Sequence, residues 1–445
     1  MSVAHVADRS YEKEIIQSKY AYIEKVVKET LFHKNKKTAS TDKIDRLLTH
    51  PVWGIPLFLL IMCLVFFLTF TVGDALKGVF EAGLDIFSGT AAALLEGLGT
   101  MGWLQSLIVE GIIAGVGGIL TFIPNIFILF LALAVLEDSG YMARVAYVMD
   151  SVMGKVGLSG KAFLPMILGF GCTVPAIMAT RALETEHDRR KTMLVTPFMS
   201  CSARLPVYVL FSDMFFPDCA AAAAFSMYVV GMIIAILAAL VINRLEKGKI
   251  NDSLLIELPE YKRPNARTIR IYVWNKLKDY LTKAGTTIFI ASIVIWFVLN
   301  FGFGGMVEDP AESFGAGLGR LLVPLLAPAG LGMWQIGVAL LSGISAKEVV
   351  VSSFAVLFGV ANANSEAGMA AIVENIHQLN PGFGPLNAYC LMLFCLLYVP
   401  CVATVATIKK ESGSWKFTLK MMVFQIVLAW AVSTLVFQVG SLFVG

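Results

Sequence analysis

Residues 169–181 read GFGCTVPAIMATR and interrupt a hydrophobic stretch with two glycines, a cysteine and a proline. A helix that only anchored a protein in lipid would carry Leu, Ile or Val at these positions. Irregular backbone inside a bilayer is tolerated only where it is buried in protein or lines a water-filled cavity, because its peptide groups otherwise lack hydrogen-bond partners. The segment therefore predicts a functional break within a membrane-embedded helix.

The composition around this break is typical of an integral membrane protein. Of the 445 residues, 57% are hydrophobic and 15% are charged, whereas soluble domains are charged at about a quarter of their positions. Several apolar runs approach the roughly 20 residues that a spanning helix needs. These runs are 55–72, 107–136, 193–216, 224–242, 284–301, 387–408 and 420–443. We expect an all-α polytopic membrane protein with about seven to eight spanning helices.

The distribution of Lys and Arg predicts which loops face the cytoplasm. Basic residues are dense in 1–50, 181–191, 244–283 and 409–420, and sparse in 73–106, 302–330 and 361–386. By the positive-inside rule the first group is cytoplasmic, with the N-terminus, and the second is external. We therefore divide the chain into a cytoplasmic or interfacial linker (1–50), which has no signal-peptide core, and a transmembrane transport domain (51–445). The net charge of +3 is too small to indicate a nucleic-acid partner.

The same rule predicts two re-entrant hairpins. Both flanks of 162–180 are cytoplasmic by charge, and both flanks of 331–360 are external, so each segment enters and leaves on one side. Residues 157–175 (GLSGKAFLPMILGFGCTVP) align without a gap on residues 330–348 (GLGMWQIGVALLSGISAKE). Entry from opposite sides then indicates an inverted repeat with broken helices, with gate repeats at about 107–242 and 284–408.

Three breaks in the apolar runs each contain a thiol. Cys172 lies in GFGCTVP, Cys201 lies in PFMSCSARLP (197–206), and Cys401 follows a proline in YVPCVAT (398–404). No CxxC or zinc-type spacing occurs, and all five histidines fall outside the apolar runs. A free cysteine can also be a small buried hydrophobe, but three thiols at three breaks favour a shared function.

Ionisable side chains at membrane depth form a second set of candidates, because their burial is costly and they default to functional roles. Glu137 and Asp138 end a long apolar run, Arg204 lies in a broken span, and Lys347 and Glu348 lie inside the second hairpin. Adjacent residues on a helix do not face each other, so Lys347 and Glu348 are not expected to pair. Arg204 needs a carboxylate partner. The alternative is that these groups neutralise one another in a supporting charge network.

The donor types indicate a divalent transition metal. We predict Cys172, Cys201, Cys401 and Glu348 as metal ligands, with thioethers nearby at Met142, Met166, Met178 and Met199. Thiolates and thioethers suit such a metal better than Mg²⁺ or Ca²⁺, and Zn²⁺, Mn²⁺ and Fe²⁺ remain open. A permeation pathway needs weak successive sites rather than a closed cage. We expect no catalytic residues and no resident cofactor.

Other classes of protein fit less well. A nucleoside or other small-solute carrier would need clusters of Asn, Gln and Ser at the breaks. A thiol enzyme would need a histidine at membrane depth to activate Cys172 or Cys201. A structural scaffold does not explain a buried Glu348 or Arg204.

Four long motifs resemble the membrane domain of the ferrous iron transport protein B (FeoB) family. They are LEDSGYMARVAYVMD, GLSGKAFLPMILGFGCTVPAIMATR, PFMSCSARLPVYVLF and LSGISAKEVVVSSFAVLFG. The likeness runs from about residue 8 to the C-terminus. It implies Fe²⁺ uptake across the bacterial cytoplasmic (inner) membrane through two gate repeats whose cysteines line the iron path. Cys172, Cys201 and Cys401 fall on those motifs.

The resemblance also implies partners. The family normally begins with a GTP-binding domain, whose phosphate loop reads GxxxxGK[ST], and this pattern does not occur in the chain. We expect a shortened chain or a separately encoded GTP-binding domain, in cis or in trans, and no GTPase activity from these residues alone. Small FeoA- and FeoC-type accessory proteins and a homo-oligomer are further partners that the family suggests.

Overall fold

The structure, a computed structural model, describes residues 17–26, 45–46, 48–50, 53–99, 101–245, 261–307, 309–360, 363 and 365–444. Within these ranges the chain is helical apart from turns and one short hairpin of β1 (Phe301–Gly302) and β2 (Gly305–Met306). The all-α class predicted from the apolar runs is confirmed. The predicted linker 1–50 lies largely outside the described residues.

The helices of the first half precede residue 246. They are α3 (Gly54–Gly97), α4 (Gly102–Ser106), a π-helical turn (Leu107–Ile113), α5 (Ala114–Asp138), α6 (Tyr141–Val156), α7 (Phe163–Gly171), α8 (Thr173–Ala179), α9 (Glu186–Val195), α10 (Leu205–Phe215) and α11 (Ala220–Leu245).

The helices of the second half begin at Ala266. They are α12 (Ala266–Tyr280), a second π-helical turn (Leu281–Gly285), α13 (Thr286–Asn300), α14 (Phe314–Leu326), α15 (Trp334–Ser342), α16 (Val349–Leu357), α17 (Glu366–Leu379), α18 (Pro385–Leu397), α19 (Val402–Ser412) and α20 (Trp415–Val444).

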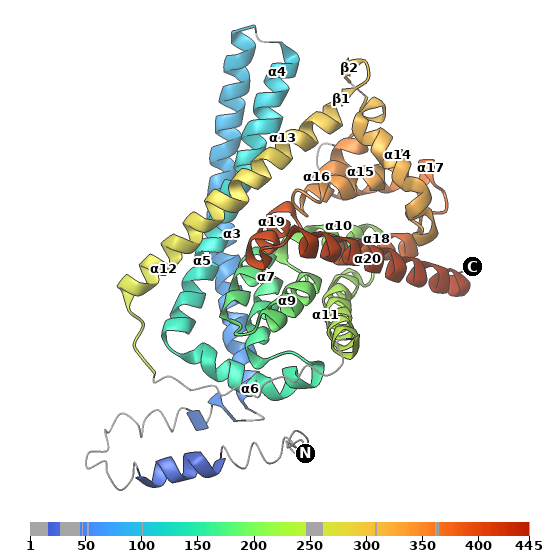
Figure 1. The fold of residues 1–445 in the computed structure, drawn as a ribbon. Coiled ribbons are helices and arrows are strands. Elements are labelled where there is room, and N and C mark those ends of the chain that lie inside the picture. The colour runs from blue at the N-terminus through green and yellow to red at the C-terminus, as the bar shows by residue number, and fades with distance from the viewer. Residues whose placement is uncertain are drawn as a thin grey trace.

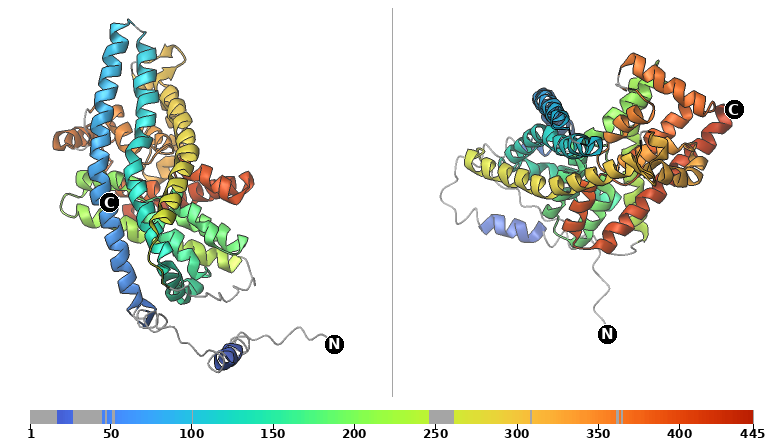
Figure 2. Two further views of the ribbon diagram at one scale, coloured as in Figure 1. Left: turned by 90° about the vertical axis from the view of Figure 1, so that its left-hand side faces the viewer. Right: turned by 90° about the horizontal axis from the view of Figure 1, so that it is seen from above.

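The helices form two groups. The helices α3, α5 and the continuous α12–α13 lie side by side (Figures 1 and 2). A second group packs beside them, with α18 against α20, α14 against α15, and α10 against α11 and α18. This second group buries the largest cluster of apolar side chains.

Five helical segments in the described residues are long and apolar enough to cross a membrane, or up to seven if each of two bent helix pairs counts as one span. The count of seven spans agrees with the lower end of the predicted seven to eight. Two of the five, Glu186–Phe215 and Pro385–Ser412, contain the breaks at Cys201 and Cys401. Helical hydrogen bonding therefore stops and restarts inside these spans.

The glycine–leucine pair that starts both aligned segments forms the same turn twice. Gly157 and Gly330 have φ of +79° and +73°, which glycine adopts without steric cost. The following amides donate to the carbonyl five residues earlier, Leu158 to Met153 at 3.0 Å and Leu331 at 3.1 Å. This is the Schellman helix ending. The shared letters thus mark one local structure that precedes α7 in the first repeat and α15 in the second.

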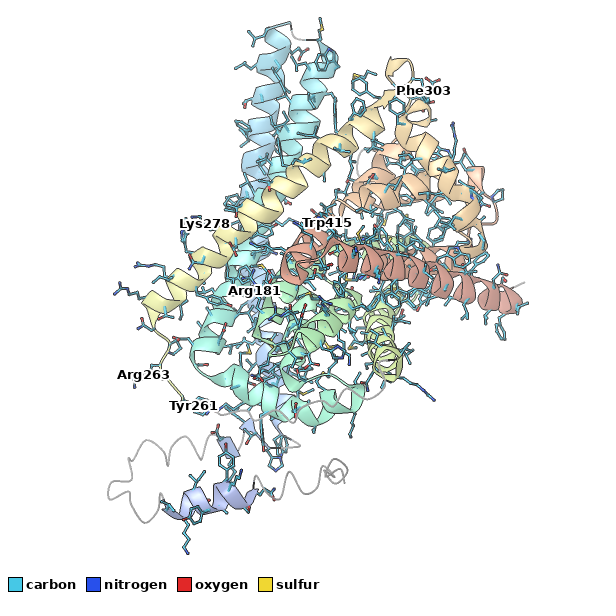
Figure 3. The ribbon with its side chains drawn as sticks, viewed as in Figure 1. Arg181, Tyr261, Arg263, Lys278, Phe303 and Trp415 are labelled. Atoms are coloured by element: carbon cyan, nitrogen blue, oxygen red, sulfur yellow. The ribbon has the colours of Figure 1, made fainter. Side chains whose placement is uncertain are left out.

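A buried arginine ties the N-terminal segment to α6. Arg144 is 1% exposed, and its Nε lies 3.0 Å from Asp45 Oδ1, while Nη1 donates to the Gly140 carbonyl at 2.9 Å. The Arg144 guanidinium also stacks 4.0 Å from the Tyr261 ring, and the Tyr261 hydroxyl donates to Asp45 at 2.7 Å. Figure 3 shows Tyr261 at the edge of the bundle near α6. The three groups join segments that are 99 and 216 residues apart.

Replacing Arg144 by Ala removes charge-assisted hydrogen bonds to a carboxylate and a carbonyl, so we expect the protein to lose about 2 kcal/mol of stability. The melting temperature of the purified protein in detergent measures this loss. Lys161→Ala serves as the control, because it breaks an exposed ion pair with Glu184 and should change stability by less than about 1 kcal/mol. Equal effects of the two substitutions would contradict the assignment.

Asp45 makes this contribution pH-dependent. Burial by itself would raise the pKa of Asp45. The hydrogen bonds from Arg144 and Tyr261 together lower the pKa by more than burial raises it, so the pKa lies below the usual 3.8. A depressed pKa stabilises the fold above the unfolded-state value and ceases to do so as the pH falls through the folded-state value. We expect the stability difference between the native chain and Asp45→Asn to be full near neutral pH and to shrink below pH 3.8. Thermal melts at several pH values measure it.

Candidate functional site

A cavity of about 120 Å³ lies where the breaks of the two repeats meet. Its wall includes all four predicted ligands, Cys172, Cys201, Cys401 and Glu348, together with Arg204 and Lys347. Residues that are up to 229 positions apart therefore share one site. Metal binding by the four predicted ligands stays a prediction.

The first hairpin reaches the cavity through Cys172, which is the single residue between α7 and α8. Its φ of −151° and ψ of 130° are extended rather than helical. The Cys172 amide still donates to the Leu168 carbonyl at 3.0 Å, and its carbonyl accepts from the Ala176 amide at 3.3 Å. The glycine-rich end of α7 thus changes the chain direction at the thiol and loses few hydrogen bonds.

The other two thiols each precede a new helical turn. Cys201 and Cys401 are extended, with φ and ψ of −77° and 159° and of −58° and 153°. The next residue in each case contacts a hairpin of the fold. The Ser202 hydroxyl donates to the Gly171 carbonyl at 2.9 Å, and the Val402 amide donates to the Ile344 carbonyl at 2.8 Å. The two broken spans are therefore docked in the same manner on the two hairpins.

Two buried cations bind the carbonyls that these breaks leave open. Arg204 is 1% exposed, and its Nη1 donates to the carbonyls of Pro197 and Met199 at 3.0 and 3.1 Å. Lys347 is 3% exposed, and its Nζ donates to the Val399 carbonyl at 2.5 Å. Met199 and Val399 each stand two residues before a cavity cysteine. The two cations thus hold equivalent carbonyls of the two broken spans.

The expectation that Arg204 pairs with a carboxylate is wrong for the described residues, where no ion pair involves it. The physical reason is that a broken helix exposes backbone carbonyls, and these accept from a guanidinium without burying a second charge. Lys347 likewise contacts a carbonyl, and its Nζ lies 3.1 Å from the centroid of the Tyr398 ring. Lys347 and Glu348 form no ion pair with each other, as expected.

Glu137 and Asp138 lie away from the cavity. They end α5, where an Asp138 carboxylate oxygen accepts from the Asn265 amide at 2.7 Å. Asp138 thus contacts the residue before α12 and Glu137 contacts Tyr272 within α12, whereas Arg204 and Lys347 line the cavity. The predicted charge network is therefore divided between two places.

The thiols share a cavity without forming a cage. Across the described part of the chain, no group of three or more His, Cys, Asp or Glu side chains is close enough to hold a metal ion. The Cys401 sulfur lies 3.2 Å from the Thr404 hydroxyl. In this conformation the donors are distributed along the cavity wall.

Sequence reasoning missed Tyr280, which is 6% exposed and lines the cavity from the end of α12. It also missed Thr69 and Asn125 on α3 and α5. Tyr280 belongs to a segment whose many basic residues indicate a cytoplasmic loop. The available signal was the position of Tyr280 beside an apolar run, but that position does not indicate which face of the helix lines the cavity.

Replacing Arg204 or Lys347 by Ala leaves buried carbonyls without donors, so we expect each variant to lose about 2 kcal/mol of stability. Arg204→Lys retains one donor and should lose less. Melting temperatures in detergent measure both effects. The control is Arg190→Ala, which breaks an exposed i,i+4 pair with Glu186 on α9 and a contact with the Phe417 ring, and should change stability by about 1 kcal/mol at most. A loss no larger than that of the control would show that the carbonyl contacts are unimportant.

Two models of known protein families match parts of the chain. The family model described as "Nucleoside recognition" matches residues 119–215 and 281–415, and the model described as "Ferrous iron transport protein B C terminus" matches residues 224–276. The first covers both broken spans and both hairpins. No solved structure matches the chain.

Curated relatives extend over almost the whole sequence. The chain is 42% identical to the Fe(2+) transporter FeoB of Staphylococcus aureus (strain MSSA476) over 98% of its own length and 64% of that protein's. It is 37% identical to the Fe(2+) transporter FeoB of Campylobacter jejuni over 96% of its length and 69% of the relative's. A third relative, 39% identical, is an Fe(2+) transport protein A/Fe(2+) transporter FeoB fusion protein of Porphyromonas gingivalis, of which the chain covers 56%.

The chain thus spans between 56% and 69% of the length of these relatives, and the matched part carries the broken spans, the hairpins and the cavity cysteines. The chain belongs to the ferrous iron transport protein B (FeoB) family and corresponds to the membrane part of the proteins in that family.

Proposed function

We propose that this chain carries Fe²⁺ across a membrane, as the membrane moiety of a FeoB-type importer. The observation that supports this most is the convergence of three thiols and one carboxylate, from breaks in both repeats, on a single cavity. Sulfur donors favour a transition metal over Mg²⁺ or Ca²⁺. The names of the relatives point to Fe²⁺ among the metals that this donor set admits.

The arrangement suits passage rather than storage. Distributed donors provide weak, successive contacts, and a permeating ion must be able to leave each site. The buried guanidinium of Arg204 acts in the same sense, because like charges repel strongly where the dielectric constant is low. Its hydrogen bonds go to the carbonyls of the broken backbone. We infer that Arg204 shortens the residence of a cation in the cavity.

A nucleoside-type substrate is the second candidate, and the description of the matched family model is its basis. The cavity of about 120 Å³ is smaller than the roughly 300 Å³ at which small-molecule pockets begin. Among its lining residues the amide of Asn125 is the only side-chain amide. Both features favour a single metal ion. Zn²⁺ and Mn²⁺ remain candidates within the metal class.

We also propose a location and partners for the chain, on the basis of its family. We place the chain in the bacterial cytoplasmic membrane with its N-terminus in the cytoplasm, as the basic loops suggest. A GTP-binding domain, in cis or in trans, would control transport, and the chain itself would catalyse no reaction. The fusion relative from P. gingivalis supports association with a FeoA-type protein.

The donor set is tested by uptake of radioactive Fe²⁺ into cells that express the chain, with and without a co-expressed GTP-binding domain. We expect Cys172→Ser, Cys201→Ser and Glu348→Ala to lower uptake at least about tenfold, the lower end of what disturbing the surroundings of a metal costs. Competition by Zn²⁺ and Mn²⁺ in the same assay measures selectivity.

The matched control is Cys63→Ser, because Cys63 is an exposed thiol on α3 outside the cavity. It should transport at the native rate. Native uptake by all three cavity variants, at equal amounts of folded protein, would exclude the thiol-lined path. Absence of Fe²⁺ uptake by the native chain with its GTP-binding domain would exclude iron as the substrate.

A further inference from the structure

A second, smaller cavity lies beside the central one. It has a volume of about 20 Å³ and shares Val174 and Tyr280 with the wall of the central cavity. Beyond these two residues its wall includes Arg181, Lys410 and Glu411. Val174 and Tyr280 therefore stand between the two cavities, and charged side chains line the far end.

An ion pair closes that far end. The Arg181 guanidinium donates through Nε and Nη2 to the two carboxylate oxygens of Glu411. The Glu411 side chain is 6% exposed and that of Arg181 is 43% exposed, so the pair lies between the interior and the surface. Figure 3 shows Arg181 in the region between α12 and α19. A two-pronged contact of this kind fixes geometry as well as charge.

The residues of this closure come from three elements that are far apart in the sequence. Arg181 follows α8 of the first repeat, Glu411 belongs to α19 of the second, and Tyr280 ends α12. The helix α19 packs both on α8 and on the π-helical turn Leu281–Gly285. That turn directly follows Tyr280. Such π-helical turns are rare in proteins, and those that occur are often at functional sites.

We propose that the small cavity is the exit route of the transported cation, closed in this structure by Val174 and Tyr280 and locked by the Arg181–Glu411 pair. The proposal rests on the transport function proposed above and adds the path out of the site. Opening separates α8 from α19 at the ion pair and moves Tyr280 aside. The freed carboxylate of Glu411 then faces the passing cation. The face that carries Arg181 and Lys410 is the one that its basic residues predict to be cytoplasmic.

Thiol accessibility tests this route without any metal. Cys172 and Cys401, both half-buried on the central cavity, report whether a reagent can enter past Tyr280. The exposed thiols are removed by Cys63→Ser and Cys219→Ser. A membrane-impermeant maleimide is applied to inside-out and, separately, to right-side-out vesicles, and peptide mass spectrometry measures the labelling rate at each cysteine.

We expect Arg181→Ala and Glu411→Ala to raise the labelling rate of Cys172 and Cys401 about fivefold, the upper end of what one partly exposed ion pair contributes. The rise occurs only from the face that carries Arg181. The charge-reversed double variant Arg181→Glu with Glu411→Arg should return the rate toward the native value. Arg181→Lys, which keeps the charge but loses the two-pronged contact, should lie between.

The matched control is Lys161→Ala, which breaks the exposed ion pair with Glu184 and should leave labelling unchanged. Native labelling rates in both single variants overturn the proposal, as does an equal rise from both faces or in the control. Because the labelling assay uses no iron, it can separate the proposed substrate from the proposed exit route. If the native chain does not transport iron but the Arg181 and Glu411 variants still change labelling, iron is rejected as the substrate. If the native chain transports iron but these variants leave labelling unchanged, the exit route is rejected.

Discussion

Broken helices in an apolar environment must satisfy the carbonyls that they release, and this constraint organises the centre of the molecule. Each broken span is extended for a few residues before its cysteine, and a carbonyl two residues before that cysteine accepts from a buried cation. Water performs this task at the surface of a soluble protein, but within a bilayer it is confined to cavities. Arg204 and Lys347 therefore hold the backbone that positions Cys201 and Cys401.

The same local arrangement of the backbone occurs twice in the chain. Gly157 and Gly330 end their helices in the same left-handed turn, and each break is hydrogen-bonded to the hairpin of its own repeat through the residue after its cysteine. The repeats are not identical in chemistry, since the first hairpin brings a thiol to the cavity and the second brings Lys347 and Glu348. Two similar sets of backbone contacts thus enclose an asymmetric site. Such a site can combine soft sulfur donors with a hard carboxylate.

The fold class and most of the candidate site could be predicted from local patterns. Apolar runs of spanning length identify membrane helices because the thickness of the bilayer sets their length. The glycine and proline residues around Cys172 and Cys401 locate breaks because these residues interrupt helical hydrogen bonding. The partner of Arg204 was predicted wrongly, because a charge-pairing rule takes no account of backbone carbonyls. Tyr280 was missed because its neighbours are basic and resemble a loop.

By itself, the sequence determined that the chain is an α-helical membrane protein, where its helices break, and which thiols lie at the breaks. Only the tertiary structure decided that these breaks meet in one cavity, that Arg204 and Lys347 bind carbonyls, and that Arg181 pairs with Glu411, 230 residues away. Helix breaks depend on neighbouring residues in the chain, so they can be predicted from a short stretch of sequence. Contacts between distant segments depend on how whole helices pack, and that packing is a property of the complete fold.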